Sequence, residues 1–405
     1  MKLQLLIFVL EIVVPTCSGA QNSAQPYLLN TTDSSVRIHW RNGDSVVQFW
    51  HQGGGHKTIV GNGRSGVLVQ PLEPATNYRY GVGAYTSTFK TAPHAGSTSK
   101  LQFFALGDCG SGAAEQLNVR NALLPYIDSS AFNAVLLLGD NAYPHGLEEE
   151  YQRHFFDVYA DGLLNRMPLY PSPGNHDYMK AKQARRRHNT SYFKIFPSAQ
   201  KIPYYSVDIG NVHLVSLDSY GKDRDGSRLR DTAGIQAQWL KKDLEAYRRS
   251  GQQWLIFIWH HPPYSMGTHH TDKEGELRLL RKRLLPIIER YGADVVLNGH
   301  SHVYERSHLI HGHHRRQKHF DSAVHVQVVP QGNIYEKKGK GTLYVVSGSA
   351  GWRGSSLPGF PHKAMPYSNA QKAGAVLLEV EGPQLRLRWV DEDGVVGDEV
   401  IVRKG

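Results

Sequence analysis

The chain has 405 residues, of which 40% are hydrophobic and 10% aromatic, and it carries a formal net charge of +10. This length favours two domains, and the apolar content is sufficient for a buried core. No apolar run after the first twenty residues approaches the length of a membrane span, which argues against a transmembrane protein. Aromatic side chains are not interleaved with the basic ones as in a stacking platform, so nucleic-acid binding is not expected.

The first twenty residues have the pattern of an export signal. A basic residue precedes an apolar core at residues 3–14 that is interrupted only by Glu11, and Ser18-Gly19-Ala20 provides a cleavage site. A buried first strand is the alternative interpretation. We therefore expect a signal peptide at residues 1–20 and a secreted, extracellular protein, or a periplasmic one if the source is bacterial. Its removal would leave Cys109 as the single cysteine, so cysteine usage gives no independent support for secretion.

Residues 24–95 have the composition of a small β domain. Residues 36–40 and 46–50 alternate or cluster apolar side chains as short strands do, and Gly- and Asn-rich turns separate such segments. The segment at residues 72–80, LEPATNYRY, resembles the tyrosine-corner segment of a fibronectin type III sandwich. We therefore expect a fibronectin type III-like β-sandwich at residues 24–95, which ends in a linker at residues 91–97.

The rest of the chain, residues 98–405, alternates short apolar runs with helix-like stretches. The apolar runs are residues 101–106, 135–138, 254–258 and 294–297, and the helix-like stretches include residues 234–249 and 274–291. Short apolar runs bounded by Gly and Pro predict buried strands, and the repeat of strand, loop and helix predicts βαβ units. Residues 375–402 alternate apolar and polar side chains, which predicts edge strands that close a sandwich. The predicted fold class is α/β, with a two-sheet βαβ sandwich after the N-terminal β-sandwich.

Polar motifs stand at the ends of these apolar runs, where side chains of adjacent strands converge on one crevice. In chain order they are Gly107-Asp108-Cys109-Gly110, Gly139-Asp140-Asn141-Ala142-Tyr143, Gly174-Asn175-His176-Asp177, Trp259-His260-His261 and Gly299-His300-Ser301-His302. Carboxylate, amide, phenolate and imidazole ligands suit iron, zinc or manganese better than Cu(I). Each motif alone is weak, since Asp108 could be a helix cap and Tyr143 a packing residue. Together they predict a site for two metal ions that transfers phosphoryl groups to water.

The five motifs resemble the GDxG, GDxx, GNH(D/E), His and GHxH blocks of the metallophosphoesterase superfamily, and Tyr143 narrows the resemblance to the purple acid phosphatases. The larger class of that family carries an N-terminal fibronectin type III-like domain. The resemblance implies an Fe(III) ion and one divalent ion (Fe, Zn or Mn), with Asp140 bridging them. The implied ligands are Asp108, Tyr143 and His302 for Fe(III), and Asn175, His260 and His300 for the divalent ion. His261 departs from the family pattern of a single His, and we interpret it as a packing residue.

Three further histidines match family positions: His176, His269 and His270. The resemblance implies that they bind the substrate and protonate the leaving group, and His270 is the favoured acid. The chemistry is suitable, because a protonated imidazole neutralises phosphate charge and donates a proton. A solvated loop is the alternative for the last two.

Two basic stretches follow ligand motifs, at residues 180–188 and 311–319. If both border the site, they would steer polyanionic substrates such as nucleotides or inositol phosphates. A pair of solvated loops is the alternative interpretation.

We therefore expect an acid phosphatase that hydrolyses phosphate monoesters of small molecules with a hydroxide generated at the metal pair. A phosphodiesterase or nucleotide pyrophosphatase on the same scaffold is the nearest alternative. An inactive binding protein is the alternative of a different class. Asn30 and Asn189 stand in possible glycosylation triplets, and the sequence does not indicate an oligomeric state.

Overall fold

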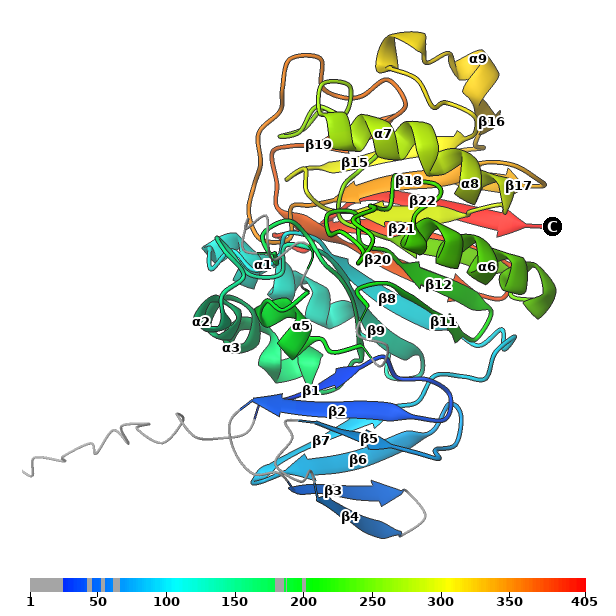
Figure 1. Cartoon of the computed structure of the whole chain (residues 1–405). Helices are drawn as coiled ribbons and strands as arrows, with labels where there is room; N and C mark the ends of the chain where they lie inside the picture. The colour runs from blue at the N-terminus through cyan, green and yellow to red at the C-terminus, as the bar shows by residue number, and fades with distance from the viewer. Residues whose placement is uncertain are drawn as a thin grey trace, which may run out of the picture.

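The computed structural model describes residues 25–41, 46–51, 55–60, 66–178, 186, 188–198 and 202–405. The expected signal peptide at residues 1–20 lies outside these residues. So does most of the basic stretch at residues 180–188, of which only Arg186 and His188 are described. Figure 1 shows a small β-sandwich beneath a larger body of sheets and helices. None of the described helices combines the length and apolar character needed to cross a membrane.

The N-terminal sandwich has two antiparallel sheets. One contains β1 (Gln25–Leu29), β2 (Val36–Arg41) and β5 (Gly66–Val69), and the other contains β4 (His56–Val60), β3 (Val46–His51), β6 (Asn77–Val82) and β7 (Tyr85–Lys90). Inward-facing side chains of both sheets, such as Ile38 and Tyr80, form one buried cluster. The backbone N–H of Glu73 donates to the Tyr78 hydroxyl (2.8 Å), which is the tyrosine corner that the sequence predicts.

The sandwich and the body share a sheet. Strand β1 pairs in parallel with β10 (Leu169–Ser172), with Leu29 opposite Leu169. The N–H of Asn30 then donates to the Leu169 carbonyl oxygen (3.1 Å). The linker expected at residues 91–97 is also packed, since Ala92 is buried in the main core. The N-terminal segment is therefore attached to the body by strand pairing at Leu169 and not only by a linker.

Two mixed sheets form the body. The first contains, in spatial order, β17 (Ile334–Lys337), β22 (Val396–Lys404), β21 (Gln384–Asp391), β20 (Gly374–Glu381), β8 (Leu101–Leu106), β9 (Phe132–Leu138) and β10, followed by β1, β2 and β5. The second contains β11 (Tyr205–Ile209), β12 (Val212–Ser216), β13 (Trp254–Ile258), β14 (Val295–Asn298), β18 (Thr342–Ser347), β15 (Tyr304–Ile310) and β16 (Val326–Val328), with β19 (Tyr367–Asn369) paired to β15. Apolar side chains of both sheets interdigitate between them, as Phe103 and Ile256 do.

The apolar runs predicted as strands are β8, β9, β13 and β14, but the C-terminal strands differ from the prediction. Strand β20 is not an edge strand, because it pairs with β8 along its length. Strand β22 is covered as well, since β17 pairs with it in parallel. The alternating pattern at residues 375–402 marks strands with two unlike faces, and it does not mark their place in the sheet.

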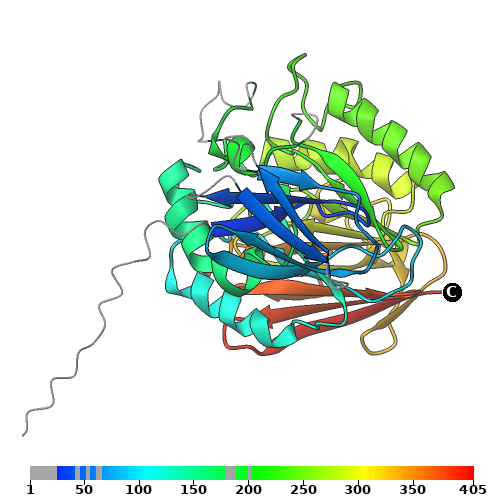
Figure 2. The same cartoon turned by 90° about the horizontal axis from the view of Figure 1, so that it is seen from below.

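Helices cover the outer faces of both sheets, which gives four layers (Figures 1 and 2). Beside the first sheet lie α1 (Ala114–Leu123), η2 (Leu124–Tyr126), α2 (Glu148–Tyr151), η3 (Gln152–Phe156), α3 (Asp157–Tyr159), η4 (Ala160–Leu164) and α5 (Ser191–Ile195). Beside the second sheet lie α6 (Ile235–Ser250), α7 (Gly275–Arg283) and α8 (Leu285–Arg290). The short η5 (Gln317–His319) and α9 (Ser322–His325) follow β15. The helix predicted at residues 274–291 is divided into α7 and α8, because Pro286 lacks the backbone N–H that a continuous helix requires.

The strand directions bring the motif residues to one place. Strands β8, β9 and β10 are parallel to one another, and so are β12, β13, β14 and β18. The loops after β8, β9, β10, β13 and β14 carry Asp108, Asp140, Asn175, His260 and His300. These residues are therefore presented at the carboxyl ends of the strands of both sheets.

Candidate metal centre

Three of the predicted ligands stand on left-handed backbone: Asp108 (φ 55°), Asp140 (φ 54°) and His300 (φ 68°). Such conformations cost residues with a Cβ on the order of 1–3 kcal/mol each and cluster at functional sites. The loops also approach one another closely. A Cβ at Gly174 would lie 2.3 Å from the backbone nitrogen of Asp140, so only glycine permits this contact.

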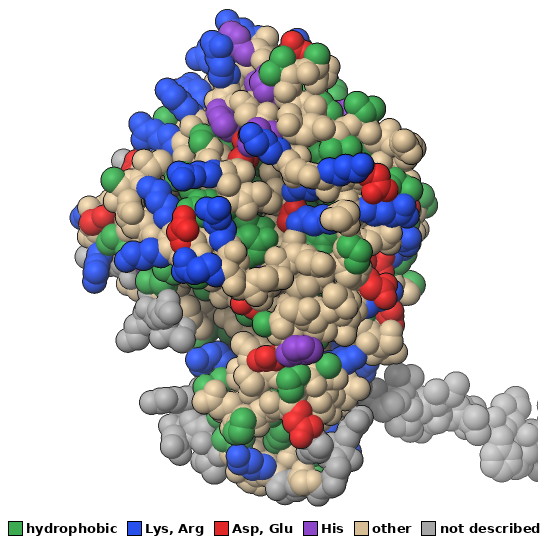
Figure 3. All heavy atoms as spheres, turned by 90° about the vertical axis from the view of Figure 1, so that its right-hand side faces the viewer, with side chains coloured by type: hydrophobic (Ala, Val, Ile, Leu, Met, Phe, Trp, Pro, Cys, Tyr) green, Lys and Arg blue, Asp and Glu red, His purple; other side chains and the backbone are tan. Residues whose placement is uncertain are grey.

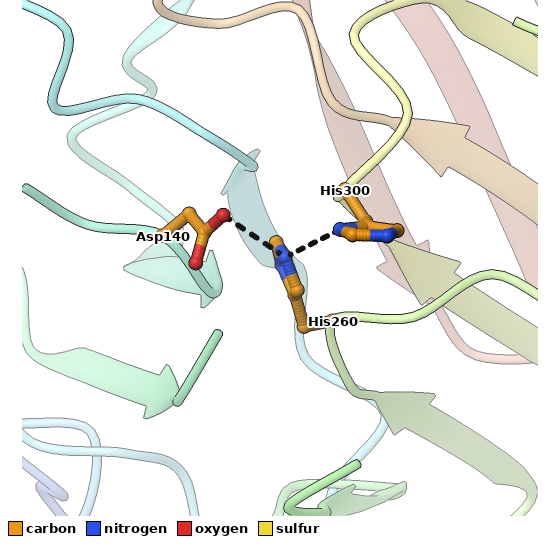
Figure 4. A group of neighbouring side chains, drawn as sticks. All are labelled: Asp140, His260 and His300. Atoms are coloured by element: carbon orange, nitrogen blue, oxygen red, sulfur yellow. Dashed lines mark hydrogen bonds and ion pairs between the residues drawn. The ribbon is translucent and has the colours of Figure 1, made fainter. Parts of the chain in front are cut away.

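Asp140, His260 and His300 form the centre of the site (Figure 4). His260 Nε2 lies 3.2 Å from Asp140 Oδ2, 3.2 Å from His300 Nδ1 and 3.1 Å from Asn175 Oδ1. His260 Nδ1 donates to the Leu138 carbonyl oxygen (2.9 Å), so Nε2 carries the lone pair that faces the other groups. A carboxylate, an amide oxygen and two imidazoles thus converge, and this donor set fits a divalent iron, zinc or manganese ion.

Asp108, Tyr143 and His302 form a second group beside the first. The Tyr143 hydroxyl lies 2.6 Å from Asp108 Oδ1, 3.1 Å from Asp140 Oδ2 and 3.3 Å from His302 Nε2. Asp140 Oδ2 therefore faces both Tyr143 and His260. A carboxylate in this position can bridge two cations about 3.5–4 Å apart.

The electrostatics of the centre favour positive charge. Burial would lower the pKa of His260, but the Asp140 and Asp108 carboxylates outweigh it and raise that pKa to about 9. Burial and the same two carboxylates raise the pKa of Tyr143 well above its ordinary value. Asp108 and Asp140 are almost fully buried. A bound cation would compensate both carboxylates and stabilise the phenolate form of Tyr143.

The hydrogen bonds of His302 do not leave its Nε2 lone pair free for a metal ion. Its Nδ1 accepts a hydrogen bond from the Trp352 indole N–H (2.7 Å), so the neutral ring carries its proton on Nε2. That Nε2 lies 3.3 Å from Asp108 Oδ1. Coordination through Nε2 requires the proton on Nδ1, and the indole contact must then be rearranged. Trp352 also packs against the Tyr143 ring, with centroids 4.6 Å apart. No motif in the sequence indicates this tryptophan.

Asp177 holds the ligand loops together. Its carboxylate accepts hydrogen bonds from the backbone N–H groups of Asp140 (2.9 Å), Asn141 (3.1 Å) and Gly174 (2.8 Å). It also accepts from the Asn141 side chain (3.0 Å) and the Tyr151 hydroxyl (2.5 Å). The residue is fully buried. Asp177 therefore links the Asp140 loop to the Asn175 loop, a role that the sequence analysis did not assign although the motif contains it.

The three additional histidines lie around the centre. His176 Nδ1 is 2.6 Å from the Pro144 carbonyl oxygen, and its Nε2 is 3.9 Å from Asp140 Oδ2. His269 stacks on His300, with ring centroids 3.7 Å apart. The structure thus brings His176 and His269 to the two groups of predicted ligands.

Glu274 orients the histidine pair His269 and His270. This carboxylate was not identified from the sequence. His269 Nδ1 lies 3.0 Å from Glu274 Oε1, so this nitrogen donates and Nε2 is directed elsewhere. His270 differs, because its Nδ1 accepts from the backbone N–H of Asp272 (3.2 Å). Glu274 Oε2 also lies 3.9 Å from His300 Nε2. One carboxylate therefore contacts both a predicted metal ligand and a predicted substrate-binding histidine.

His261 packs beside the ligand set. Its Nδ1 lies 2.8 Å from the Ser219 hydroxyl, and its ring packs between Tyr220 and His300. This placement agrees with its interpretation as a packing residue. The basic stretch at residues 311–319 reaches the loop of His269 and His270 through Gln317, whose N–H donates to Asp272 Oδ2 (2.8 Å).

Comparison with known proteins identifies the family of the chain. The profile of the calcineurin-like phosphoesterase family matches residues 101–304, just over half of the chain. The chain belongs to this family. The phosphoesterase is 27% identical over 321 residues to purple acid phosphatase 15 of Arabidopsis thaliana, covering 66% of the chain and 57% of the relative. It is 30% identical over 235 residues to human (Homo sapiens) tartrate-resistant acid phosphatase type 5, covering 51% of the chain and 68% of the relative.

The fold of the phosphoesterase is also similar to a solved structure. A purple acid phosphatase isolated from yellow lupin (Lupinus luteus) seeds superposes with a TM-score of 0.76 at 18% identity, covering 95% of this chain and 75% of that chain. The phosphoesterase spans little more than half the length of the Arabidopsis relatives that it matches. The resemblance of sequence and fold to purple acid phosphatases therefore stands, and the α/β fold class with its N-terminal sandwich is confirmed.

If Asp140 bridges two cations, the substitution Asp140→Asn should lower the bound metal per chain and reduce turnover by more than about 100-fold, because it removes one charge and one shared oxygen. Elemental analysis after dialysis measures the metal. Asp128→Asn is the matched control, because Asp128 is a carboxylate at the opposite end of β9 with Lys100 as its partner. Full metal content in Asp140→Asn would contradict the bridging role.

Proposed function

We propose that the chain is a binuclear-metal acid phosphatase that hydrolyses phosphate monoesters of small molecules. The observation that carries this proposal is the Asp140 carboxylate, which faces two adjacent groups of metal-type donors. When bound, two cations there would lower the pKa of water and supply a nucleophile at mild pH. Secretion through residues 1–20, and the division into segments 24–95 and 98–405, belong to the same proposal.

Residues of the chain would bind the phosphate and donate a proton to the leaving oxygen. His176 and His269 lie against the ligand groups, His270 follows His269 in the same loop, and the three would contact phosphate oxygens. The backbone N–H of His176 donates to Asp140 Oδ1 (2.7 Å), which fixes its loop against the shared carboxylate. His269 keeps Nε2 directed away from Glu274, so in the protonated ring this atom can donate to a leaving oxygen.

The nearest rival function is hydrolysis of phosphodiesters on the same scaffold. A monoester dianion carries one more charge than a diester, and at about 4 Å one charge is worth roughly 1–4 kcal/mol. We therefore expect the metal-loaded enzyme to show a kcat/KM for p-nitrophenyl phosphate at least about tenfold above that for bis(p-nitrophenyl) phosphate. The reverse order would favour a phosphodiesterase. Loss of both activities in a fully metal-loaded protein would favour the inactive binding protein.

The identity of the metals is tested by colour. We propose Fe(III) at Asp108, Tyr143 and His302, and divalent iron, zinc or manganese at Asn175, His260 and His300. A phenolate bound to Fe(III) absorbs visible light, so Tyr143→Phe should abolish a visible band that the iron-loaded protein shows. Tyr126→Phe is the control, because its hydroxyl donates to the backbone carbonyl oxygen of Gly394 (3.3 Å) and, among the described residues, to no predicted ligand. A colourless protein with full iron content would refute iron–phenolate binding and leave the two-metal site standing.

From the sequence, His270 is preferred as the acid for the leaving group, but we propose His269, because its Nδ1 donates to Glu274 and its ring is held against His300. We expect His269→Ala to slow an alkyl phosphate by about 10²–10⁴-fold, and an aryl phosphate with an acidic leaving group much less. His270→Ala is the matched variant and should slow both esters to a similar extent. Steady-state kinetics with both substrates measures the contrast. Equal losses in His269→Ala would return His270 to this role.

A further inference from the structure

A groove lies between α6 and α8, away from the metal centre. It has a volume of about 550 Å³. Its α6 wall contains Gln238, Lys241, Lys242, Glu245 and Arg249, which recur at helical spacing on one stripe of the helix. The facing wall comes from Pro286, Ile287, Arg290 and Tyr291. The floor is partly apolar and the rim is basic.

A second hollow of about 530 Å³ adjoins the first, because both include Pro286 and Arg290. It is lined further by Lys340, His311 and His314. The two hollows together are here called the α6–α8 groove. Figure 3 shows the face of the molecule that is on the right in Figure 1, where Lys and Arg side chains outnumber Asp and Glu over the upper body.

Positive charge outweighs negative charge in the α6–α8 groove, because five Lys and Arg side chains line it beside two carboxylates, Glu245 and Glu289. Lys241, Lys242, Arg249, Arg290 and Lys340 form no ion pair with any other residue that the structure describes. Lys241 Nζ contacts only the Thr232 carbonyl oxygen (2.8 Å). Cations of the neighbouring helix α7 are paired in contrast: Arg281, for example, pairs with Asp272.

The two carboxylates in the lining are already engaged. Glu245 accepts the hydroxyl hydrogen of Tyr291. Glu289 is buried and accepts from His314 Nε2 (2.9 Å), the N–H of Gly312 (3.0 Å) and the Tyr344 hydroxyl (2.7 Å). These bonds fix the positions of both carboxylates but keep their negative charge, so an anionic partner would meet five cations against two carboxylates.

The α6–α8 groove lies at the end of the strands opposite the metal centre. Arg249 and Arg290 stand just before β13 and β14, whereas His260 and His300 stand just after those strands. A strand rises about 3.3 Å per residue, so the two sites are separated by roughly a strand length of 15 Å or more. The groove is thus a second surface and not an extension of the substrate site.

The residues around the α6–α8 groove indicate which class of anionic partner fits it. The Tyr291 ring lies under Arg248, 5.8 Å from its guanidinium carbon, so it offers no free platform for a nucleobase. The large hydrophobic residues that are exposed are Leu68, Leu117, Val324, Val329, Val395 and Val396, and none of them lines the groove. Insertion into a membrane is therefore not favoured. Cations spaced along a groove fit a linear polymer that carries regularly spaced anions.

We propose that the α6–α8 groove binds a linear sulfated polysaccharide. This inference goes beyond the phosphatase function and does not depend on it. Heparin is the probe, and the full mature chain is applied to immobilised heparin and eluted with salt. The triple variant Lys242→Glu, Arg249→Glu, Arg290→Glu should elute at lower salt and bind heparin at least about tenfold more weakly, because three attractive charges are replaced by three repulsive ones.

The matched control reverses Arg153, Arg166 and Lys194, which are exposed cations on the opposite side of the body. It should retain heparin affinity, and both variants should keep wild-type monoester turnover and thermal midpoint. Equal loss of heparin binding in both variants would overturn the proposal in favour of general charge attraction. Vesicles of phosphatidylserine, or poly-glutamate, that displace heparin at equal charge concentration would overturn the choice of partner. Unchanged affinity in the groove variant would overturn the site itself.

Discussion

Two buried carboxylates, Asp108 and Asp140, set the conditions that the surrounding structure has to meet. An ionised group removed from water costs several kcal/mol unless charge and hydrogen bonds compensate it. The chain places both carboxylates where two sheets converge, on backbone that is itself strained. Their partners are histidines, a tyrosine and backbone N–H groups, and not lysine or arginine. Compensation by bound cations is the arrangement that this donor set allows, so metal binding and stability of the loops should be linked.

Much of the site could be predicted from the sequence because its chemistry is local. Asp108, Asp140, His260 and His300 each follow a short apolar run, and glycine neighbours mark where loops approach. The four strands carrying these runs form as their composition predicts. Pro286, which divides the predicted helix, is also visible in the sequence, but its effect competes with the amphipathic pattern on both sides.

The parts that could not be predicted depend on contacts between distant segments. The role of Glu274 follows from a loop that folds back to His269 and His300, and Trp352 reaches His302 from a segment fifty residues further on. The choice between His269 and His270 rests on which ring nitrogen donates, and residue type does not determine that. In the same way, the pattern of β20 gives its two faces, while its position beside β8 is decided by pairing across the whole sheet.

The pairing of β1 with β10 gives the N-terminal sandwich a protective role for the sheet. Strand β10 ends at Ser172, just before the loop that carries Asn175, and β1 occupies its outer side. Without the sandwich, the start of β10 at Leu169 would lose its backbone partners on this side, and unpaired backbone groups at a sheet edge invite pairing with other chains. A shortened chain that begins at residue 98 would retain every predicted ligand and still be prone to intermolecular association. Engineering that exchanges the N-terminal module must therefore supply a replacement strand at this edge.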